Sequence, residues 1–285
     1  MSDNYIQKVN AVVFDWAGTT VDYGCFAPLA AFIQSFEQHG IIVTEDEVRG
    51  PMGMKKKDHI RVLLQLEGVQ QQWLEKFGRL PDERDVDKLY ASFEPMLMQV
   101  LPAYTSLIPG VQELMGELRS RGIKIGSTTG YTSEMMSVLT RAAEEQGYKP
   151  DYMITSDEVP AGRPAPYMCY QNAIALQVFP LTACVKVGDT ISDIQEGLNA
   201  GMWSVGVVFG GSEFGLTEQQ MSALNEEERQ ARMSAVRTKF AQAGAHYTID
   251  SIGGLLEVID HINQRLAQGE MPSMRSVTTG ASCNG

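Results

Sequence analysis

The stretch AVVFDWAGTT, residues 11–20, is an apolar run followed by one carboxylate, Asp15, and a short turn rich in Gly and Thr. The run 11–14 is apolar at every position, which is typical of a parallel strand covered on both faces. Asp15 would then stand at the carboxyl end of that strand. A buried Asp at such a place often only stabilises a turn, so its surroundings have to decide between a structural and a catalytic role.

Five more apolar runs of strand length follow along the chain: Ile123–Ser127, Tyr152–Ile154, Cys184–Val187, Trp203–Val208 and His246–Ile249. Helical patterns separate most of them, namely Gly110–Arg121, Ser133–Glu145, Pro166–Gln177 and Asp193–Ala200. Strands that alternate with helices in this way form an open parallel sheet with right-handed crossovers. The sequence therefore predicts an α/β fold with a doubly wound parallel sheet.

The connection between the first two predicted strands spans roughly a hundred residues, far more than an ordinary crossover needs. Five helical segments are expected within it: Pro28–Gln38, Glu45–Arg49, Lys55–Glu67, Gln70–Phe77 and Asp85–Val100. We interpret residues 22–102 as an inserted helical cap domain, so that residues 1–21 and 103–268 form the α/β core domain. Residues 269–285 are small and polar, and we expect them to form a flexible tail.

The composition excludes several classes of function. A net charge of −12 over 285 residues argues against a nucleic-acid partner. The four cysteines are widely spaced and form no C-x-x-C, which indicates neither a disulfide framework nor a zinc site. The N-terminal residues have no apolar segment, and no stretch is long enough for a membrane helix. We expect a cytoplasmic protein that binds neither nucleic acid nor membrane.

Polar residues follow four of the predicted strands at their carboxyl ends. They are Asp15, the segment STTG at 127–130, Arg163, and the segment GDTISD at 188–193. In an open parallel sheet these ends meet in one crevice, where ligands bind. Taken singly, 188–193 could be only a helix cap and Arg163 only a surface residue. Four clusters in this order favour a single site.

Asp15, Asp189 and Asp193 would repel one another in one pocket unless a cation lay between them. Hard oxygen ligands of this kind suit Mg²⁺. The hydroxyl group of Thr129 and the guanidinium group of Arg163 would donate to phosphoryl oxygens, a task for which the fork of Arg is well shaped. The set predicts a metal-assisted site for phosphoryl transfer.

This order of motifs resembles the haloacid dehalogenase superfamily. The segments DWAGTTVD at 15–22, PMGMKKKDH at 51–59 and VPAGRP at 159–164 resemble its phosphonatase family more closely, and the likeness runs from Val9 to His261. The resemblance implies hydrolysis of the carbon–phosphorus bond of a small phosphonate, phosphonoacetaldehyde, to acetaldehyde and phosphate. It also implies Mg²⁺ as cofactor, with the backbone carbonyl of Ala17 among the metal ligands, and a homodimer formed through the caps.

The residue at position 17 agrees with this chemistry. Most members of the superfamily carry a second acid two residues after the nucleophile, and it protonates the leaving oxygen; here that place holds Ala17. Cleaving a carbon–phosphorus bond expels a carbanion, which needs an electron sink more than a proton donor. The resemblance implies that a cap lysine supplies the sink as an imine with the substrate aldehyde, while Asp15 accepts the phosphoryl group.

Three consecutive lysines compete for that role. The family pattern Met-Gly-x-x-Lys-x-Asp-His falls on Lys56, and helical spacing would put Met52, Lys56 and His59 on one face, with Lys55 and Lys57 solvated to either side. For a single lysine in such a run a solvated charge is the ordinary alternative. His59 would shuttle protons for imine formation, or else be a structural histidine bonded to its neighbours.

Three more residues resemble pocket-lining positions of the family: Met52, Cys25 and Tyr131. Met52 would pack over the imine, although a core position is the more common role for Met. A phosphatase or a dehalogenase on the same fold remains an alternative to the phosphonatase interpretation, as does a binding protein without activity. Fold alone does not distinguish them.

Overall fold

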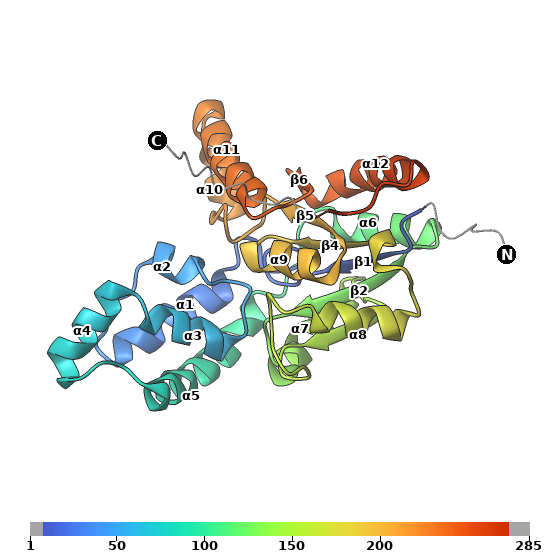
Figure 1. The fold of residues 1–285 in the computed structure, drawn as a ribbon. Helices are drawn as coiled ribbons and strands as arrows, with labels where there is room; N and C mark the ends of the chain where they lie inside the picture. Colours follow the sequence, from blue (N-terminus) through green and yellow to red (C-terminus); the bar gives the residue numbers. More distant parts are fainter. Residues whose placement is uncertain (1–7, 274–285) are drawn as a thin grey trace, which may run out of the picture.

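The computed structural model describes residues 8–273, which form one six-stranded sheet flanked by helices (Figure 1). The strands are β1 Ala11–Phe14, β2 Lys124–Thr129, β3 Tyr152–Thr155, β4 Cys184–Gly188, β5 Trp203–Val207 and β6 Tyr247–Ile249. All neighbouring strands pair in parallel, in the order β3-β2-β1-β4-β5-β6. The doubly wound parallel sheet is confirmed, and each strand begins and ends within two residues of its predicted bounds.

The α-helices in chain order are α1 Phe26–Gln38, α2 Glu45–Arg49, α3 Lys56–Leu64, α4 Glu67–Phe77, α5 Glu83–Val100, α6 Val111–Ser120, α7 Ser133–Glu145, α8 Tyr167–Leu176, α9 Ile191–Ala200, α10 Glu218–Ala223, α11 Glu226–Gln242 and α12 Leu255–Ala267. Short 3₁₀ turns lie at Leu101–Ala103, Leu181–Ala183 and Ile252–Gly254. No helix of the described residues 8–273 is long and apolar enough to cross a membrane.

The central strand β1 is buried on both faces. Val12 and Phe14 pack into the large cluster that includes α6, α7 and α12, whereas Ala11 and Val13 pack into a second cluster with α8 and α9. Each fully buried Val or Phe side chain contributes about 1.5–3 kcal/mol through the area it removes from water. The continuous apolar run therefore fixes β1 in the middle of the sheet.

The order of the strands reverses between β1 and β4, which makes this the switch point of the sheet. Phe14 pairs with Val187 in register, and the amide of Asp15 donates to the carbonyl oxygen of Val187 at 2.9 Å. Asp15 and Asp189 thus leave two adjacent strands at the same edge. A doubly wound sheet binds its ligands at this edge.

Helices α1–α5 form a separate group beside this edge of the sheet (Figure 1). Phe32 of α1 stacks on Phe93 of α5, with ring centroids 4.2 Å apart. The chain enters this group through Asp22 and Cys25, which both have a positive φ. The carboxylate of Asp22 accepts from the amides of Phe26 and Ala27 and so stabilises the start of α1. The group matches the expected cap, although its status as a separate domain stays a prediction.

Two expectations about helices were wrong or incomplete. Helix α3 begins at Lys56, with Lys55 as its N-cap, so Met52 lies in the preceding turn and not on the helix. The turn forms because Gly53 has φ +85°, a conformation that a continuing helix does not allow. Helices α10–α12 were not predicted. Of the expected flexible tail, residues 274–285 lie outside the described residues.

Candidate active site

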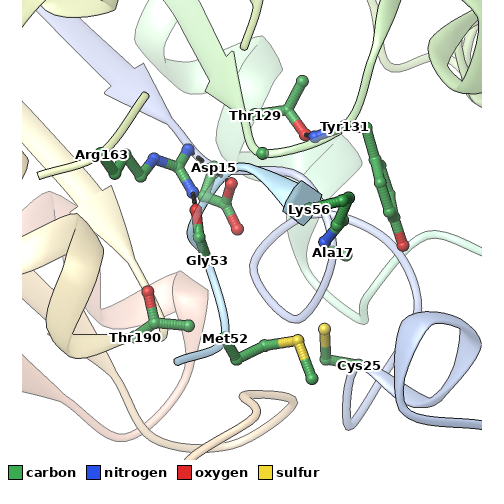
Figure 2. A pocket seen from close by; sticks show the side chains of 11 residues that line it. Asp15, Ala17, Cys25, Met52, Gly53, Lys56, Thr129, Tyr131, Arg163 and Thr190 are labelled. Carbon is green, nitrogen blue, oxygen red and sulfur yellow. Dashed lines mark hydrogen bonds and ion pairs between the residues drawn. The ribbon is translucent and has the colours of Figure 1, made fainter. Parts of the chain in front are cut away.

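A small cavity lies between the carboxyl edge of the sheet and the cap (Figure 2). Its open space is about 20 Å³, room for roughly one water molecule. Eight predicted site residues line it: Asp15, Ala17, Cys25, Met52, Lys56, Thr129, Tyr131 and Arg163. The structure therefore brings together residues from the core and from the cap that lie up to 148 positions apart in the sequence.

Asp15 and Arg163 form a buried ion pair at one side of this cavity (Figure 2). The Nη2 atom of Arg163 donates to Asp15 Oδ1 at 2.6 Å, and the Arg163 side chain is fully buried. Burial raises the pKa of Asp15, although the charge of Arg163 opposes that shift. The pair fixes the carboxylate at the edge of the cavity, where an electrophile can meet it.

Every nitrogen of the Arg163 guanidinium group already contacts an acceptor. Nε donates to Glu196 Oε2 at 2.9 Å, and Nη1 lies 3.1 Å from Asp193 Oδ1. Nη2 also donates to the carbonyl oxygen and the hydroxyl of Thr128. In this structure Arg163 holds the carboxylate of Asp15 in place, and its expected contact with a phosphoryl group stays a prediction.

Asp189 is held in place by two donors. Its Oδ1 accepts from the hydroxyl of Thr19 at 2.8 Å and its Oδ2 from the amide of Ser212 at 2.7 Å. Gly18 has φ +87°, and a Cβ atom there would lie only 2.3 Å from Asp189 Oδ2. The turn after β1 therefore needs glycine at this position, because any side chain would displace the carboxylate.

Oxygen atoms of Asp15, Asp189 and Asp193 lie within 4.8 Å of one another, as a metal site requires. The buried cluster around them contains a fourth carboxyl group, Glu196, and two cations, Arg163 and Lys186. The ionised cluster would carry two uncompensated negative charges, and burying such charges is costly. A divalent cation matches that charge, so these residues fit the expected Mg²⁺.

The three aspartates differ in how far nearby cationic side chains of the protein neutralise their negative charge. Burial, with the charges of Asp15 and Asp193, raises the pKa of Asp189 well above its usual value. Burial also acts on Asp193, but the charges of Arg163 and Lys186 outweigh it and lower the pKa of Asp193. Lys186 Nζ lies 2.6 Å from Asp193 Oδ1, and Thr190 donates to Oδ2 at 2.5 Å. Asp15 and Asp189 are therefore the carboxylates that most need a cation.

Lys56 lies on the cap side of the cavity, beside the ring of Tyr131 (Figure 2). Its Nζ atom is 4.5 Å from the centroid of that ring, and only 5 % of the residue is exposed. Burial lowers the pKa of Lys56 to about 8, with Arg163 contributing in the same direction and Cys25, Asp15 and Asp22 opposing. Burial thus gives this amine a larger neutral fraction at neutral pH than an exposed lysine has. The adjacent lysines, Lys55 and Lys57, are not among the main causes of this shift.

Comparison with known proteins agrees with this geometry. The family model of haloacid dehalogenase-like hydrolases matches residues 9–201. The chain belongs to this family. The phosphonoacetaldehyde hydrolase of Bacillus cytotoxicus is 53% identical over 258 residues, which cover 90% of this chain and 98% of that protein. The resemblance to the phosphonatase family is therefore confirmed.

Two further relatives are similar to this hydrolase over most of its length. A bifunctional phosphonoacetaldehyde hydrolase/aminoethylphosphonate transaminase of Clostridioides difficile is 51% identical over 95% of this chain and 42% of its own length. The crystal structure of a phosphonoacetaldehyde hydrolase-like protein from Oleispira antarctica superposes with a TM-score of 0.91 at 41% identity. It covers 95% of this chain and all of the other. The fold of this hydrolase is thus shared along nearly its whole length.

The other two lysines of the run lie outside the cavity of this hydrolase. Lys57 pairs with Asp87 at 2.7 Å and lies over the ring of Tyr90. Lys55 precedes α3, and its Cβ atom packs against Gly162. Both are partly exposed, whereas Lys56 is buried. The predicted distinction between Lys56 and its two neighbours agrees with these positions.

His59 lies on the same buried face of α3 as Lys56, but it does not line the cavity. Its ring packs on Phe32, with centroids 3.9 Å apart, and the same Phe32 ring is 5.9 Å from Lys56 Nζ. Burial, together with the charge of Lys56, lowers the pKa of His59 well below its usual value. The imidazole is therefore neutral at neutral pH. Its role as a proton shuttle stays a prediction.

Cys25, Met52 and Tyr131 supply the apolar wall around the amine (Figure 2). Burial raises the pKa values of Cys25 and Tyr131 well above their usual ranges, so both stay neutral. Thr129 accepts from the amide of Tyr131 at 3.1 Å, which leaves its hydroxyl proton for another acceptor. This apolar wall explains why burial lowers the pKa of Lys56.

The sequence analysis did not identify Lys186 and Glu196, the buried ion-pair partners of Asp193 and Arg163. Lys186 sits inside the apolar strand β4, and Glu196 follows Asp193 by three residues on α9. A charge in a strand buried on both faces, and two acids on one helical face, were signals that could have found them. Gly53 was missed as well. Its carbonyl oxygen accepts from Arg163 Nη1 at 3.3 Å, which brings the cap loop onto the core.

Proposed function

We propose that this hydrolase cleaves the carbon–phosphorus bond of phosphonoacetaldehyde to give acetaldehyde and phosphate. The observation that carries the proposal is the joint presence, around one closed cavity, of the carboxylate of Asp15 and the depressed-pKa amine of Lys56. Ala17 lines the same cavity where a phosphatase of this family would place its acid. The names of the curated relatives support the same substrate.

Lys56 acts first on the aldehyde. Its neutral amine adds to the carbonyl carbon, and loss of water gives a protonated imine that bears the positive charge on nitrogen. The Tyr131 ring, 4.5 Å from Nζ, stabilises that charge through its π face. His59 would move the protons that imine formation requires. The imine draws electrons from the neighbouring carbon–phosphorus bond.

Asp15 then accepts the phosphoryl group. Its carboxylate oxygen forms a bond to phosphorus while the carbon–phosphorus bond breaks, and the electron pair of that bond moves into the imine to give a neutral enamine. Protonation of the enamine carbon and hydrolysis of the imine release acetaldehyde and restore Lys56. Water hydrolyses the aspartyl phosphate and restores Asp15. Thr129 is the hydroxyl donor, and Arg163 the guanidinium donor, proposed for the phosphoryl oxygens.

Mg²⁺ is the cofactor that we propose for the carboxylate cluster, where it would neutralise the phosphoryl oxygens. Asp15, Asp189 and the carbonyl group of Ala17 would hold it. Asp193 belongs to the same site, but both of its oxygens already accept from Lys186 and Thr190. Its contribution is therefore the placement of its neighbours or a ligand contact through water.

An assay of acetaldehyde release with and without Mg²⁺ tests this function. We expect release to stop in excess chelator and to return when Mg²⁺ is added, because the buried cluster otherwise holds two more negative than positive charges. Asp189→Ala should remove activity or raise the Mg²⁺ requirement. Hydrolysis of phosphate esters without acetaldehyde release would indicate a phosphatase. Full turnover in excess chelator would favour a dehalogenase. If no substrate is turned over, the protein would be a binding protein without activity.

The pH dependence of kcat/KM should report the amine of Lys56. With a pKa of about 8, roughly a tenth of the amine is neutral at pH 7 and roughly nine tenths at pH 9. We expect kcat/KM to rise with pH through this range, since only the neutral amine attacks the aldehyde. Lys55→Arg should keep the same profile. A rise centred near the ordinary lysine pKa would contradict the assigned burial effect.

We also propose a homodimer formed through the caps. Ile42, Leu74, Phe77 and Leu80 are apolar yet between 43% and 71% exposed. The side chain of Gln72 bonds both backbone groups of Ile42, which places that residue beside α4. An exposed group of this kind favours a protein partner.

Leu74→Glu combined with Phe77→Glu should therefore convert a dimer into a monomer in light scattering behind gel filtration. Ile174→Glu is the matched control, because Ile174 is 70% exposed on α8 of the core. It should leave the mass unchanged. A monomeric parent protein, or a dimer that survives both cap substitutions, would contradict the proposed surface.

A cytoplasmic location is part of this proposal, on the evidence of cysteine usage. Cys25, Cys169 and Cys184 are buried as free thiols. Cys283 lies outside the described residues.

A further inference from the structure

Arg49 connects the cap to the core on the side away from Lys56. It is the last residue of α2, and its Nη1 atom donates to the carbonyl oxygens of Gly24 at 2.9 Å and Ser212 at 3.1 Å. Its guanidinium group also lies 5.0 Å from the centroid of the Phe26 ring. Gly24 and Phe26 lie where the chain enters the cap, and Ser212 lies in the core loop after β5. One cap side chain therefore spans the junction.

Ser212 also holds Asp189. Its amide donates to Asp189 Oδ2 at 2.7 Å, and only 1% of the residue is exposed. The preceding Gly211 packs so closely that a Cβ atom there would lie 2.8 Å from the Cβ of Asp189. The loop 209–216 thus fixes the orientation of one of the two carboxylates that most need a cation.

The two hydrogen bonds of the Ser212 backbone involve its N–H group and its carbonyl group, which lie on either side of its Cα atom. Its N–H group reaches Asp189 in the core, and its carbonyl group reaches Arg49 in the cap. Rotation of this residue would weaken both bonds together. While Arg49 holds the carbonyl group, the amide is kept pointing at the carboxylate.

The structure has this connection together with a cavity of about 20 Å³, which is too small to hold a phosphonate. Substrate entry therefore requires a wider cavity. A movement of α2 away from the loop 209–216 would widen it and would break the contact of Arg49 with Ser212.

We propose that Arg49 is a positioning residue, which transmits closure of the cap through Ser212 to the orientation of Asp189. The cation site would thereby reach its full affinity only when the cap covers the substrate. This inference rests on the metal site of the proposed function. Arg49 itself takes no part in bond making. Residues behind metal ligands commonly change metal affinity by about 10- to 100-fold when they are replaced.

The test compares Arg49→Met with Arg232→Met in the full-length protein. Arg232 donates to the carbonyl oxygen of Phe214, in the same loop, at 3.1 Å, and lies over the Phe214 ring, but it comes from α11 of the core. It is therefore a matched control for general loosening of the loop. Binding of Mn²⁺ alone, measured by electron paramagnetic resonance, reports the site without turnover. Hydrogen exchange of segment 209–216 in metal-free protein reports the loop.

For Arg49→Met we expect the Kd of Mn²⁺ to rise about tenfold, with faster exchange of segment 209–216 in the metal-free protein. Arg232→Met should keep the Kd of the parent protein within about twofold. Arg49→Lys keeps a single cationic donor and should fall between parent and Arg49→Met; it also serves if Arg49→Met does not fold. An unchanged Kd and exchange rate in the Arg49 variants, or an equal rise of the Kd in Arg232→Met, overturns the inference. If the parent protein binds no Mn²⁺, the proposed metal site is itself wrong.

Discussion

Asp15→Asn is expected to abolish acetaldehyde release, with a loss on the order of 10⁴-fold or more, as for other covalent nucleophiles. An amide oxygen is a poor nucleophile and cannot form the acyl phosphate. The substitution keeps the size of a side chain that is almost fully buried, so the fold should survive. Steady-state turnover, with a thermal unfolding curve as a check on folding, measures the effect.

Asp151→Asn is the matched control for Asp15→Asn. Asp151 lies at the opposite, amino end of the strands, where its carboxylate accepts from the backbone amide of Ile125. It should keep most of the activity. In Asp15→Asn, imine formation at Lys56 should persist, because that step does not use the carboxylate. Substantial turnover of Asp15→Asn would remove this residue from the mechanism.

Lys56→Arg is expected to lower carbon–phosphorus cleavage by at least about 10³-fold, because removal of a residue that forms a covalent intermediate leaves only the remaining catalytic groups. Guanidinium keeps the positive charge but does not form the imine at neutral pH. Reduction with borohydride in the presence of substrate or acetaldehyde should convert the parent Lys56 into a secondary amine. Peptide mapping of the reduced protein identifies the labelled residue.

The adjacent lysines give the controls for Lys56→Arg. Lys57→Arg keeps a cation beside Asp87 and over the Tyr90 ring, and Lys55→Arg alters a partly exposed side chain before the helix. Both should retain most activity and should carry no label. A label on either residue, or an active Lys56→Arg enzyme, would overturn the imine mechanism.

The sheet could be predicted because its central strands are buried on both faces. The continuous apolar run 11–14 and the mostly apolar run 203–207 stand out from the amphipathic helices between them. Helix α11 lacks such a signal, since only Met233, Val236 and Phe240 are buried along its 17 residues. Helix α12 does carry a helical repeat, with Leu255, Ile259 and Ile262 buried, and was missed although its pattern was present.

The site residues that could be predicted are those that follow a strand or fit a motif of fixed spacing. Asp15 and Asp189 follow adjacent strands, and Lys56 fits a local pattern. The contacts of Arg163 with Glu196, and of Arg49 with Ser212, join residues 33 and 163 positions apart. Such pairings depend on the packing of loops that have no periodic pattern. Met52 shows the opposite case: its expected helical register was wrong, yet the turn at Gly53 still brings it to the cavity.

The two groups proposed to react belong to different parts of the protein: Asp15 follows strand β1 of the sheet, and Lys56 begins helix α3 of the cap. After cleavage in the proposed mechanism, the phosphoryl half of the substrate is bonded to one part and the two-carbon half to the other. Opening of the cap would then carry the halves away from each other while both are still attached. The bond could not re-form while the cap stays open, so each half would then leave by its own hydrolysis, the phosphoryl group from Asp15 and the two-carbon group from Lys56.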